Sequence, residues 1–176
     1  MRGLDQTSRD DNPPVELVPY DETWPTKFAA ERVLLENVLA PWLTGTIEHI
    51  GSTAIAQMPA KPIIDIMAPV RTLEDSRLAM AAASSAGYIY YPYKADVMHW
   101  FCKPSPSIRT HHLHLVPFAS ALWNERLRFR DLLRQHPEIA AEYADLKLRL
   151  AQEFRSDREA YTEAKGPFVH RVLSHA

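Results

Sequence analysis

The distribution of apolar and polar residues predicts strands in the first two thirds of the chain. Six short runs are rich in β-branched, aromatic and other apolar residues, and most of them are flanked by Pro or Gly, which is typical of strands. They cover residues 15–18, 47–50, 63–70, 88–91, 98–102 and 112–116. The first run is short, and we expect it at the edge of a sheet.

Apolar residues that recur every three or four positions predict helices between and after these strands. The first helix begins near Thr23 and ends before Pro41. Its expected apolar stripe consists of Phe28, Leu34, Leu35, Val38 and Leu39. A second helix, made of small residues, begins at a capping box formed by Thr72 and Asp75 and is closed by Gly87.

From Ser120 onward the pattern is helical. One helix ends at His136, and the next has a regular apolar face. That face consists of Ile139, Tyr143, Leu146, Leu150 and Phe154. The last helical region is interrupted at Pro167, which either opens a new helix or lies within a continuous one. The order of elements predicts an α/β (α+β) fold, with a mixed sheet flanked by helices and a helical C-terminal region.

Composition narrows the class of protein. Hydrophobic residues make up 46% of the 176 residues, so we expect one domain over residues 15–176, preceded by a loose tail at 1–14. The net charge of −2 argues against nucleic acid as a partner, and the lack of about 18 consecutive apolar residues argues against a membrane span. The single cysteine fits a reducing compartment, so we expect a cytoplasmic protein.

The segment from Ile47 to Val70 carries the most specific chemical signal. It reads as a strand, a Gly51-Ser52 turn, a short helix and a second strand with one acid, Asp65. Glycine lets backbone approach a phosphate closely, helix-start amides bind anions, and a strand carboxylate can hold the accompanying metal. Two alternatives stay open: the turn is an ordinary helix N-cap, and Asp65 is satisfied by an arginine or by backbone amides.

Histidines and basic residues supply further candidates. In a strand, His112 and His114 point to one face, and two imidazoles on one face form half of a metal site. The alternative is that they only hydrogen-bond within the sheet. Lys61 precedes the Asp65 strand, and Lys165 would stand at the start of a helix opened by Pro167. Helical arginines such as those at 126, 128 and 130 are most often solvated or paired with acids.

Six segments together resemble the GrpB family. They are Val-Glu-Leu-Val-Pro-Tyr-Asp-Glu-Thr-Trp-Pro (15–25), Ile-Glu-His-Ile-Gly-Ser-Thr-Ala (47–54), Ala-Lys-Pro-Ile-Ile-Asp-Ile (60–66), His-Leu-His-Leu (112–115), Leu-Arg-Phe-Arg-Asp-Leu-Leu-Arg (127–134) and Tyr-Thr-Glu-Ala-Lys-Gly-Pro-Phe (161–168). The resemblance covers nearly everything from residue 15 on. It implies the fold of the nucleotidyltransferase superfamily. In some bacteria a domain of this family is fused behind dephospho-CoA kinase.

The superfamily pattern is a Gly-Ser or Gly-Gly turn, a strand with two acids two residues apart, and a third acid on another strand. The Gly-Ser turn and Asp65 match it. Met67 stands where the second acid is expected, and the strand expected to bring the third acid brings His112 and His114. Histidine ligands favour Zn²⁺, Mn²⁺ or another transition metal over Mg²⁺, so the identity of the divalent metal stays open.

The resemblance and the residues together predict a protein that binds a nucleotide, such as a nucleoside triphosphate, or another phosphorylated small molecule. Asp65 and Ser52 are the expected catalytic residues, and Asp65, His112 and His114 are the expected metal ligands. The expected phosphate contacts are Gly51, Ser52, Thr53, Lys61, Arg130 and Lys165. The alternative is a non-catalytic ligand-binding or accessory module that supports a partner enzyme, and Met67 favours it.

Overall fold

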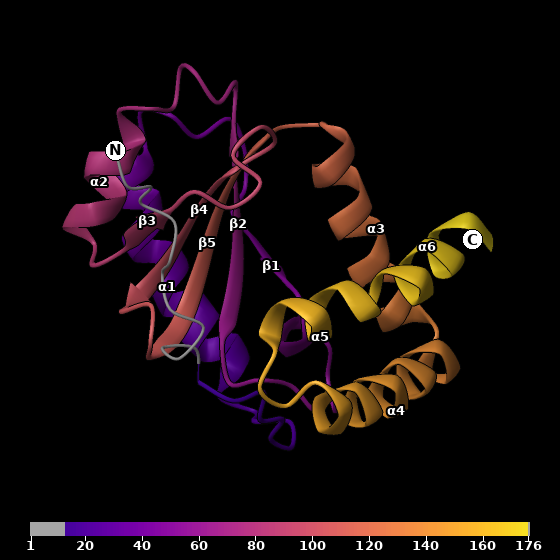
Figure 1. Cartoon of the computed structure of the whole chain (residues 1–176). Coiled ribbons are helices and arrows are strands. Elements are labelled where there is room, and N and C mark those ends of the chain that lie inside the picture. The colour runs from indigo at the N-terminus through magenta and orange to yellow at the C-terminus, as the bar shows by residue number, and fades with distance from the viewer. Residues whose placement is uncertain (1–12, 176) are drawn as a thin grey trace, which may run out of the picture.

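The computed structural model describes residues 13–175, in which five strands form one mixed sheet with helices on both sides (Figure 1). The strands are β1 (Glu48–Ile50), β2 (Ile64–Val70), β3 (Ile89–Tyr91), β4 (His99–Pro104) and β5 (Arg109–Pro117). Their order in the sheet is β1-β2-β5-β4-β3. The central pair, β2 and β5, is parallel, and every other neighbouring pair is antiparallel.

Helices cover both sides of the sheet (Figure 1). They are α1 (Trp24–Leu39) and α2 (Ala79–Ser85) on one side, and α3 (Ala121–Gln135), α4 (Pro137–Glu153), α5 (Arg158–Ala164) and α6 (Gly166–His175) on the other. A short 3₁₀ helix, η2 (Ser52–Ala54), follows β1. The mixed sheet flanked by helices, with a helical C-terminal region, confirms the predicted fold class.

Local capping accounts for several helix starts. The Ser120 side chain accepts a hydrogen bond from the Trp123 amide at the start of α3, and the Asp157 side chain accepts one from the Ala160 amide at the start of α5. Of the two alternatives left open by the sequence, the structure has α6 beginning at Gly166, with Pro167 in its first turn.

Three predicted details are wrong. The expected strand at 15–18 forms only an isolated bridge, between Val18 and Ala60. The Thr72 hydroxyl accepts from the Asp75 amide, but this bond closes a turn, and α2 begins only at Ala79. In α1, Leu34 is 38% exposed and does not belong to the buried stripe. The tail expected at 1–14 lies outside the described residues except for its last two.

Strand alternation separates two environments on the two faces of the sheet. On β2, Ile64 and Ile66 join the large apolar core beneath α1, whereas Met67 packs with Met98 and Trp123 beneath α3. Asp65 shares the α3 face with Met67. Within residues 13–175 no helix has the length and apolar character needed to cross a lipid bilayer.

Candidate functional site

Strand register brings the predicted acid and histidines onto one face of the sheet. Asp65 lies directly opposite Ile50 of β1 and opposite His112 of β5, and His114 lies opposite Met67. Because β2 and β5 are parallel and side chains alternate, all three chemical groups project toward the same side. This placement is the one expected from the His-Leu-His-Leu alternation.

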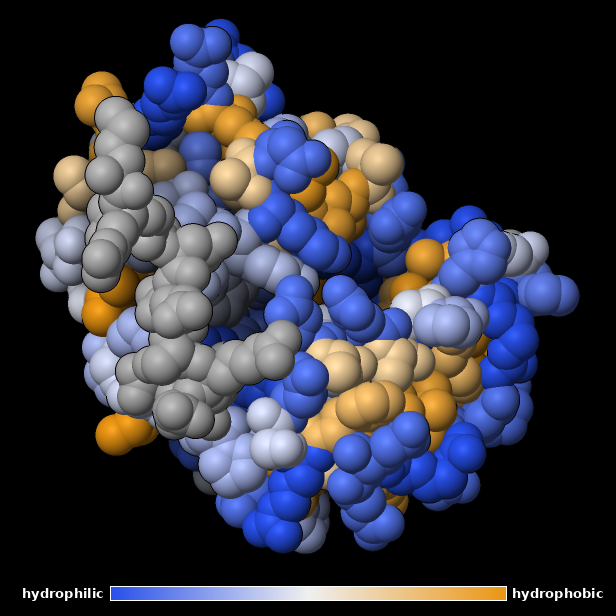
Figure 2. Space-filling view, in the orientation of Figure 1, coloured by the Kyte–Doolittle hydropathy of each residue, from blue (hydrophilic) through white to orange (hydrophobic). Residues whose placement is uncertain are grey.

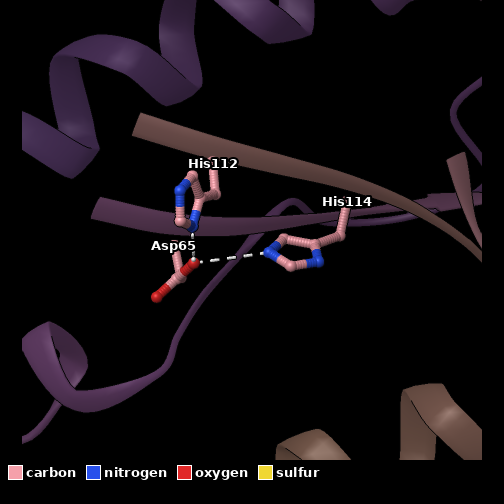
Figure 3. A group of neighbouring side chains, drawn as sticks. All are labelled: Asp65, His112 and His114. Atoms are coloured by element: carbon pink, nitrogen blue, oxygen red, sulfur yellow. Dashed lines mark hydrogen bonds and ion pairs between the residues drawn. The ribbon is translucent and has the colours of Figure 1, made fainter. Parts of the chain in front are cut away.

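Both imidazoles donate to one oxygen of Asp65 (Figure 3). His112 Nδ1 lies 3.0 Å from Asp65 Oδ1, and His114 Nε2 lies 3.4 Å from the same atom. Burial alone raises the pKa of Asp65, but the hydrogen bonds from the two histidines outweigh it and hold this pKa well below its usual range. Asp65 is therefore an ionised carboxylate, and its side chain remains 29% exposed to solvent.

An arginine on α3 fixes the proton position of His114. Arg126 Nη1 lies 2.7 Å from His114 Nδ1, and because a guanidinium only donates, Nδ1 must be the acceptor. Burial and the Arg126 charge lower the pKa of His114 to about 4, so the ring is neutral at pH 7 and carries its proton on Nε2. His114 is thus committed as a donor to Asp65.

His112 is held differently. Its Nδ1 donates to Asp65, whereas its Nε2 is buried and has no hydrogen-bond partner among the described residues. Its ring packs against Trp100 of β4, with the ring centroids 4.8 Å apart. A buried ring nitrogen without a partner is uncommon, and it leaves His112 able to change its tautomer without breaking a second bond.

The second oxygen of Asp65 faces the Gly-Ser turn. Gly51 has a φ of +72°, and a Cβ built on it would lie 2.7 Å from Asp65 Oδ2. Glycine is required here for the backbone conformation and for this close approach. Oδ2 therefore stays free of the histidines and points to the turn, where the amides of Ser52 and Thr53 donate to no acceptor among the described residues.

Three lysine side chains lie in this region, and one of them contacts the turn directly. Lys147 of α4, only 1% exposed, donates from Nζ to Ser52 Oγ at 2.8 Å and to the Pro59 carbonyl. The ammonium groups of Lys61 and Lys165 both lie over the ring of Tyr161, at 5.4 and 4.4 Å from its centroid. The structure thus brings two of the predicted phosphate contacts, Lys61 and Lys165, together on one ring.

Other predicted contacts point elsewhere. The Thr53 side chain is buried and its hydroxyl lies 2.9 Å from His49 Nε2, so only its amide faces the turn. Arg130, predicted to bind phosphate, donates to Glu48 at 2.6 Å, to Asp131 at 2.8 Å and to the His49 carbonyl at 3.1 Å.

Three arginines of α3 hold the site together at four-residue spacing. Arg126 reaches His114 on β5, Arg130 reaches β1, and Arg134 donates to the Ala54 carbonyl of η2 at 2.9 Å. Residues 126, 130 and 134 lie on one helix face. This arginine row joins α3 to three separate parts of the site.

Sequence reasoning missed several contributors. Arg126 was visible only as one of several helical arginines. Lys147 had a clearer signal: it lies four residues after Tyr143 and three before Leu150, on the face expected to be apolar. A lysine on a buried helix face is rarely placed there by packing alone.

One face of the molecule is hollowed (Figure 2), and the candidate metal ligands lie close to one another. Figure 2 shows a hollow between the sheet and the helices α5 and α6, rimmed by hydrophilic residues. The nitrogen and oxygen atoms offered by Asp65, His112 and His114 lie within 4.8 Å of one another, close enough to share a metal ion. One carboxylate and two imidazoles form a donor set that suits transition metals better than Mg²⁺.

Comparison with known proteins places this site in a family. The family model described as GrpB protein matches residues 14–175. The chain belongs to the GrpB family. It is 40% identical over 174 residues to a UPF0157 protein of Pseudomonas aeruginosa, covering 96% of this chain and 70% of that protein.

Two further matches extend this finding. The chain is 34% identical over 162 residues to the UPF0157 protein YqkA of Bacillus subtilis, covering 92% of this chain but only 47% of that protein. The crystal structure of conserved protein GrpB from Enterococcus faecalis superposes with a TM-score of 0.81 at 30% identity, covering 91% of this chain and 96% of that one. The resemblance to the GrpB family and the predicted fold class are therefore confirmed.

Proposed function

We propose that this GrpB-family protein binds a nucleotide or another phosphorylated small molecule at the Gly51-Ser52 turn, with a divalent metal at Asp65, and transfers a nucleotidyl or phosphoryl group. The observation that carries the proposal is the position of Asp65 Oδ2, which faces the turn while Oδ1 is occupied by two histidines. A phosphate at the turn would meet free amides on one side and a carboxylate-bound cation on the other.

The donor set limits how a metal would be held. Asp65 and His112 are its first ligands in this proposal, because His112 can move its proton to the unpartnered Nε2 and free Nδ1. His114 becomes a third ligand only when Arg126 turns away from its Nδ1. The metal would supply Lewis-acid neutralisation of phosphate charge. Lys61 and Lys165 would neutralise the remaining charge, and the Ser52 hydroxyl would orient the phosphate.

A matched pair of variants tests the proposal. Binding of ATP is measured by calorimetry with Mn²⁺ and again with excess chelator. We expect Asp65→Asn to keep the native circular dichroism and to weaken Mn²⁺-dependent binding at least tenfold, because the amide keeps the shape but lacks the charge. Asp75→Asn removes an equal charge from an exposed turn and should bind as the wild type does. Equal binding by all three proteins would remove Asp65 from the site.

Metal content gives an independent measurement. We expect elemental analysis of His112→Ala/His114→Ala to show less bound metal than the wild type, with native circular dichroism. Unchanged metal content in the double variant, or a wild type that holds no metal after dialysis against Mn²⁺ and Zn²⁺, would defeat the ligand assignment.

A second candidate function is a non-catalytic module that binds the same ligand and supports a partner enzyme. The observation in its favour is Met67, which is fully buried against Met98 and Trp123 and occupies the position of the second acid. The additional length of the B. subtilis relative is consistent with a module joined to other sequence. Metal-dependent nucleotide binding with no release of pyrophosphate or phosphate would favour this candidate over the enzyme.

A further inference from the structure

Three lysine side chains, Lys61, Lys147 and Lys165, lie close enough together for their charges to act on one another. Lys147 holds the Ser52 hydroxyl, and Lys61 and Lys165 share the ring of Tyr161. Within residues 13–175 none of the three forms a salt bridge with an acid. Within these residues they contact uncharged groups, namely a hydroxyl, a backbone carbonyl and two aromatic rings.

This arrangement costs folding free energy. Ammonium groups lose hydration on burial, and like charges repel more strongly where water is excluded. Burial, together with the charge of Lys165, lowers the pKa of Lys61 and Lys147 to about 7, and burial lowers that of Lys165 to about 8. Packing alone would be served at lower cost by apolar side chains, so the cluster is better explained by a ligand.

A structural role accounts for only one of the three. Lys147 bonds both Ser52 and the Pro59 carbonyl, and so joins α4 to the turn. Within residues 13–175, the ammonium groups of Lys61 and Lys165 make no such bonds, and both lie over the ring of Tyr161. Their convergence on Tyr161, from a loop before β2 and from the end of α5, places two cations where an anion would hold both.

The charge balance of the cleft indicates what kind of anion. The charges of Arg109 and Arg158 also act on Lys61, while the Asp65 carboxylate acts on Lys61 and Lys165. A single phosphate group carries about −1.5 to −2 charges at pH 7, which one divalent metal at Asp65 would already offset. The lysines would then have no partner. A chain of linked phosphates supplies the additional negative charge they require.

We propose that Lys61, Lys147, Lys165 and Ser52 form a subsite for the distal phosphates of a polyphosphate chain, so that the ligand carries linked phosphates rather than a single phosphate. The proposal deepens the proposed function and rests on it for the phosphate nearest Asp65. A nucleoside triphosphate and an inorganic polyphosphate share this chemistry.

Inorganic tripolyphosphate tests the subsite without a metal or a nucleoside. Calorimetric titrations at pH 7 in excess chelator compare tripolyphosphate with orthophosphate on the full chain. We expect the tripolyphosphate affinity to be at least tenfold higher, and Lys61→Met, Lys147→Met and Lys165→Met each to lower it at least tenfold. Lys27→Met removes the same charge from α1, on the opposite side of the sheet, and should change the affinity less than twofold.

Several results of these titrations would contradict the proposed subsite. Equal affinity for tripolyphosphate and orthophosphate, wild-type affinity in the Lys61 and Lys165 variants, or an equal loss in Lys27→Met would each overturn the proposal. If Lys147→Met fails to fold because its two bonds are lost, the Lys61 and Lys165 variants decide, since among the described residues those two ammonium groups make no hydrogen bond of this kind.

Two further comparisons identify which compound supplies the linked phosphates and show whether the subsite depends on the proposed function. In excess chelator, a higher affinity for ATP than for tripolyphosphate indicates a nucleotide ligand, and equal affinities indicate an inorganic polyphosphate. Either result supports the subsite. The wild type could fail to bind ATP in the presence of Mn²⁺ while Asp65→Asn still binds tripolyphosphate. That result would support the subsite and contradict the proposed function.

Discussion

The two faces of the sheet bury charged side chains in opposite ways. Beneath α1, Glu31 is 8% exposed and accepts from the Tyr88 hydroxyl at 2.8 Å and from Lys103 Nζ, with His111 Nε2 at 3.8 Å. One acid there meets one ammonium group, one hydroxyl and one imidazole. Every charge has its counterpart within the chain.

Beneath the C-terminal helices the buried charges are not balanced in this way. Asp65 accepts hydrogen bonds from His112 and His114, and within residues 13–175 the three lysines form no salt bridge with an acid. Both clusters are similarly buried, so burial does not distinguish them. Charge balance does: a neutralised cluster stabilises the fold, whereas an unbalanced one is completed by a ligand.

The largest effect is expected on the balanced face. Glu31→Gln leaves Lys103 without its acid and should lower the free energy of unfolding by about 3 kcal/mol, with tripolyphosphate binding unchanged. Urea denaturation measures this loss. Glu36→Gln, which breaks an exposed pair with Arg32 on the same helix, should cost no more than about 0.5 kcal/mol. A Glu31 variant as stable as the wild type would contradict the assigned structural role.

A somewhat smaller loss of stability is expected at the turn, together with a loss of binding. Gly51→Ala places a methyl group 2.7 Å from Asp65 Oδ2 on a backbone with φ of +72° and should cost about 2 kcal/mol. Mn²⁺-dependent ATP binding should disappear because Asp65 is displaced. Gly166→Ala is the control, since its added Cβ meets nothing within 4 Å. An alanine variant with native stability and binding would show that the close approach is unimportant.

The lysines of the unbalanced face should make the free energy of unfolding depend on pH. Lysine pKa values lowered from 10.5 to about 7 or 8 mean that the unfolded chain binds more protons between those limits. The free energy of unfolding should therefore rise with pH from 7.5 to 9, and below pH 7 the full penalty is present. The other groups facing these lysines are Arg109, Arg158, Asp65, Tyr143 and Tyr161. Burial raises the pKa of both tyrosines, and hydrogen bonds from the histidines outweigh burial and hold the pKa of Asp65 low, so neither kind of group changes its charge between pH 7.5 and 9.

Chemical denaturation at several pH values measures this slope. Saturating tripolyphosphate should flatten it, because the bound anion keeps the lysines protonated, and Lys147→Met should reduce it. A stability that falls from pH 7.5 to 9 would contradict the charge-balance comparison.

The smallest effect is expected from Arg126→Met. Removing the guanidinium should raise the pKa of His114 from about 4 toward its ordinary value, with little change in stability. The titration of the His114 ring is followed by NMR. Arg128→Met changes an exposed position of the same helix and should leave that titration unchanged. An unmoved His114 pKa in the Arg126 variant would mean that burial alone determines it.

Much of the sheet side of the site could be predicted from the sequence. Strand alternation placed His112 and His114 on one face, and the Gly51-Ser52 turn before the Asp65 strand indicated that these groups meet. The strand expected at 15–18 failed for a local reason. Prolines at 13, 14 and 19 have no amide proton, so that segment could form only one isolated bridge.

The contacts that the helices contribute to the site could be predicted less completely. Whether Arg126 reaches a histidine or solvent depends on how α3 docks on the sheet, which its own periodicity does not determine. The same holds for Arg130, whose guanidinium meets Glu48 rather than the turn. Lys147 is the exception, because its place on an apolar helix face was visible in the sequence.

The arginine row of α3 has a consequence for the kinetics of ligand entry. Because Arg126, Arg130 and Arg134 bond β5, β1 and η2 at once, the helix cannot swing away from the sheet without breaking several charge-assisted hydrogen bonds. The arrangement of α3, the sheet and η2 is therefore set before any ligand arrives. Stopped-flow mixing with tripolyphosphate should show a single phase whose rate rises linearly with concentration and falls with added salt.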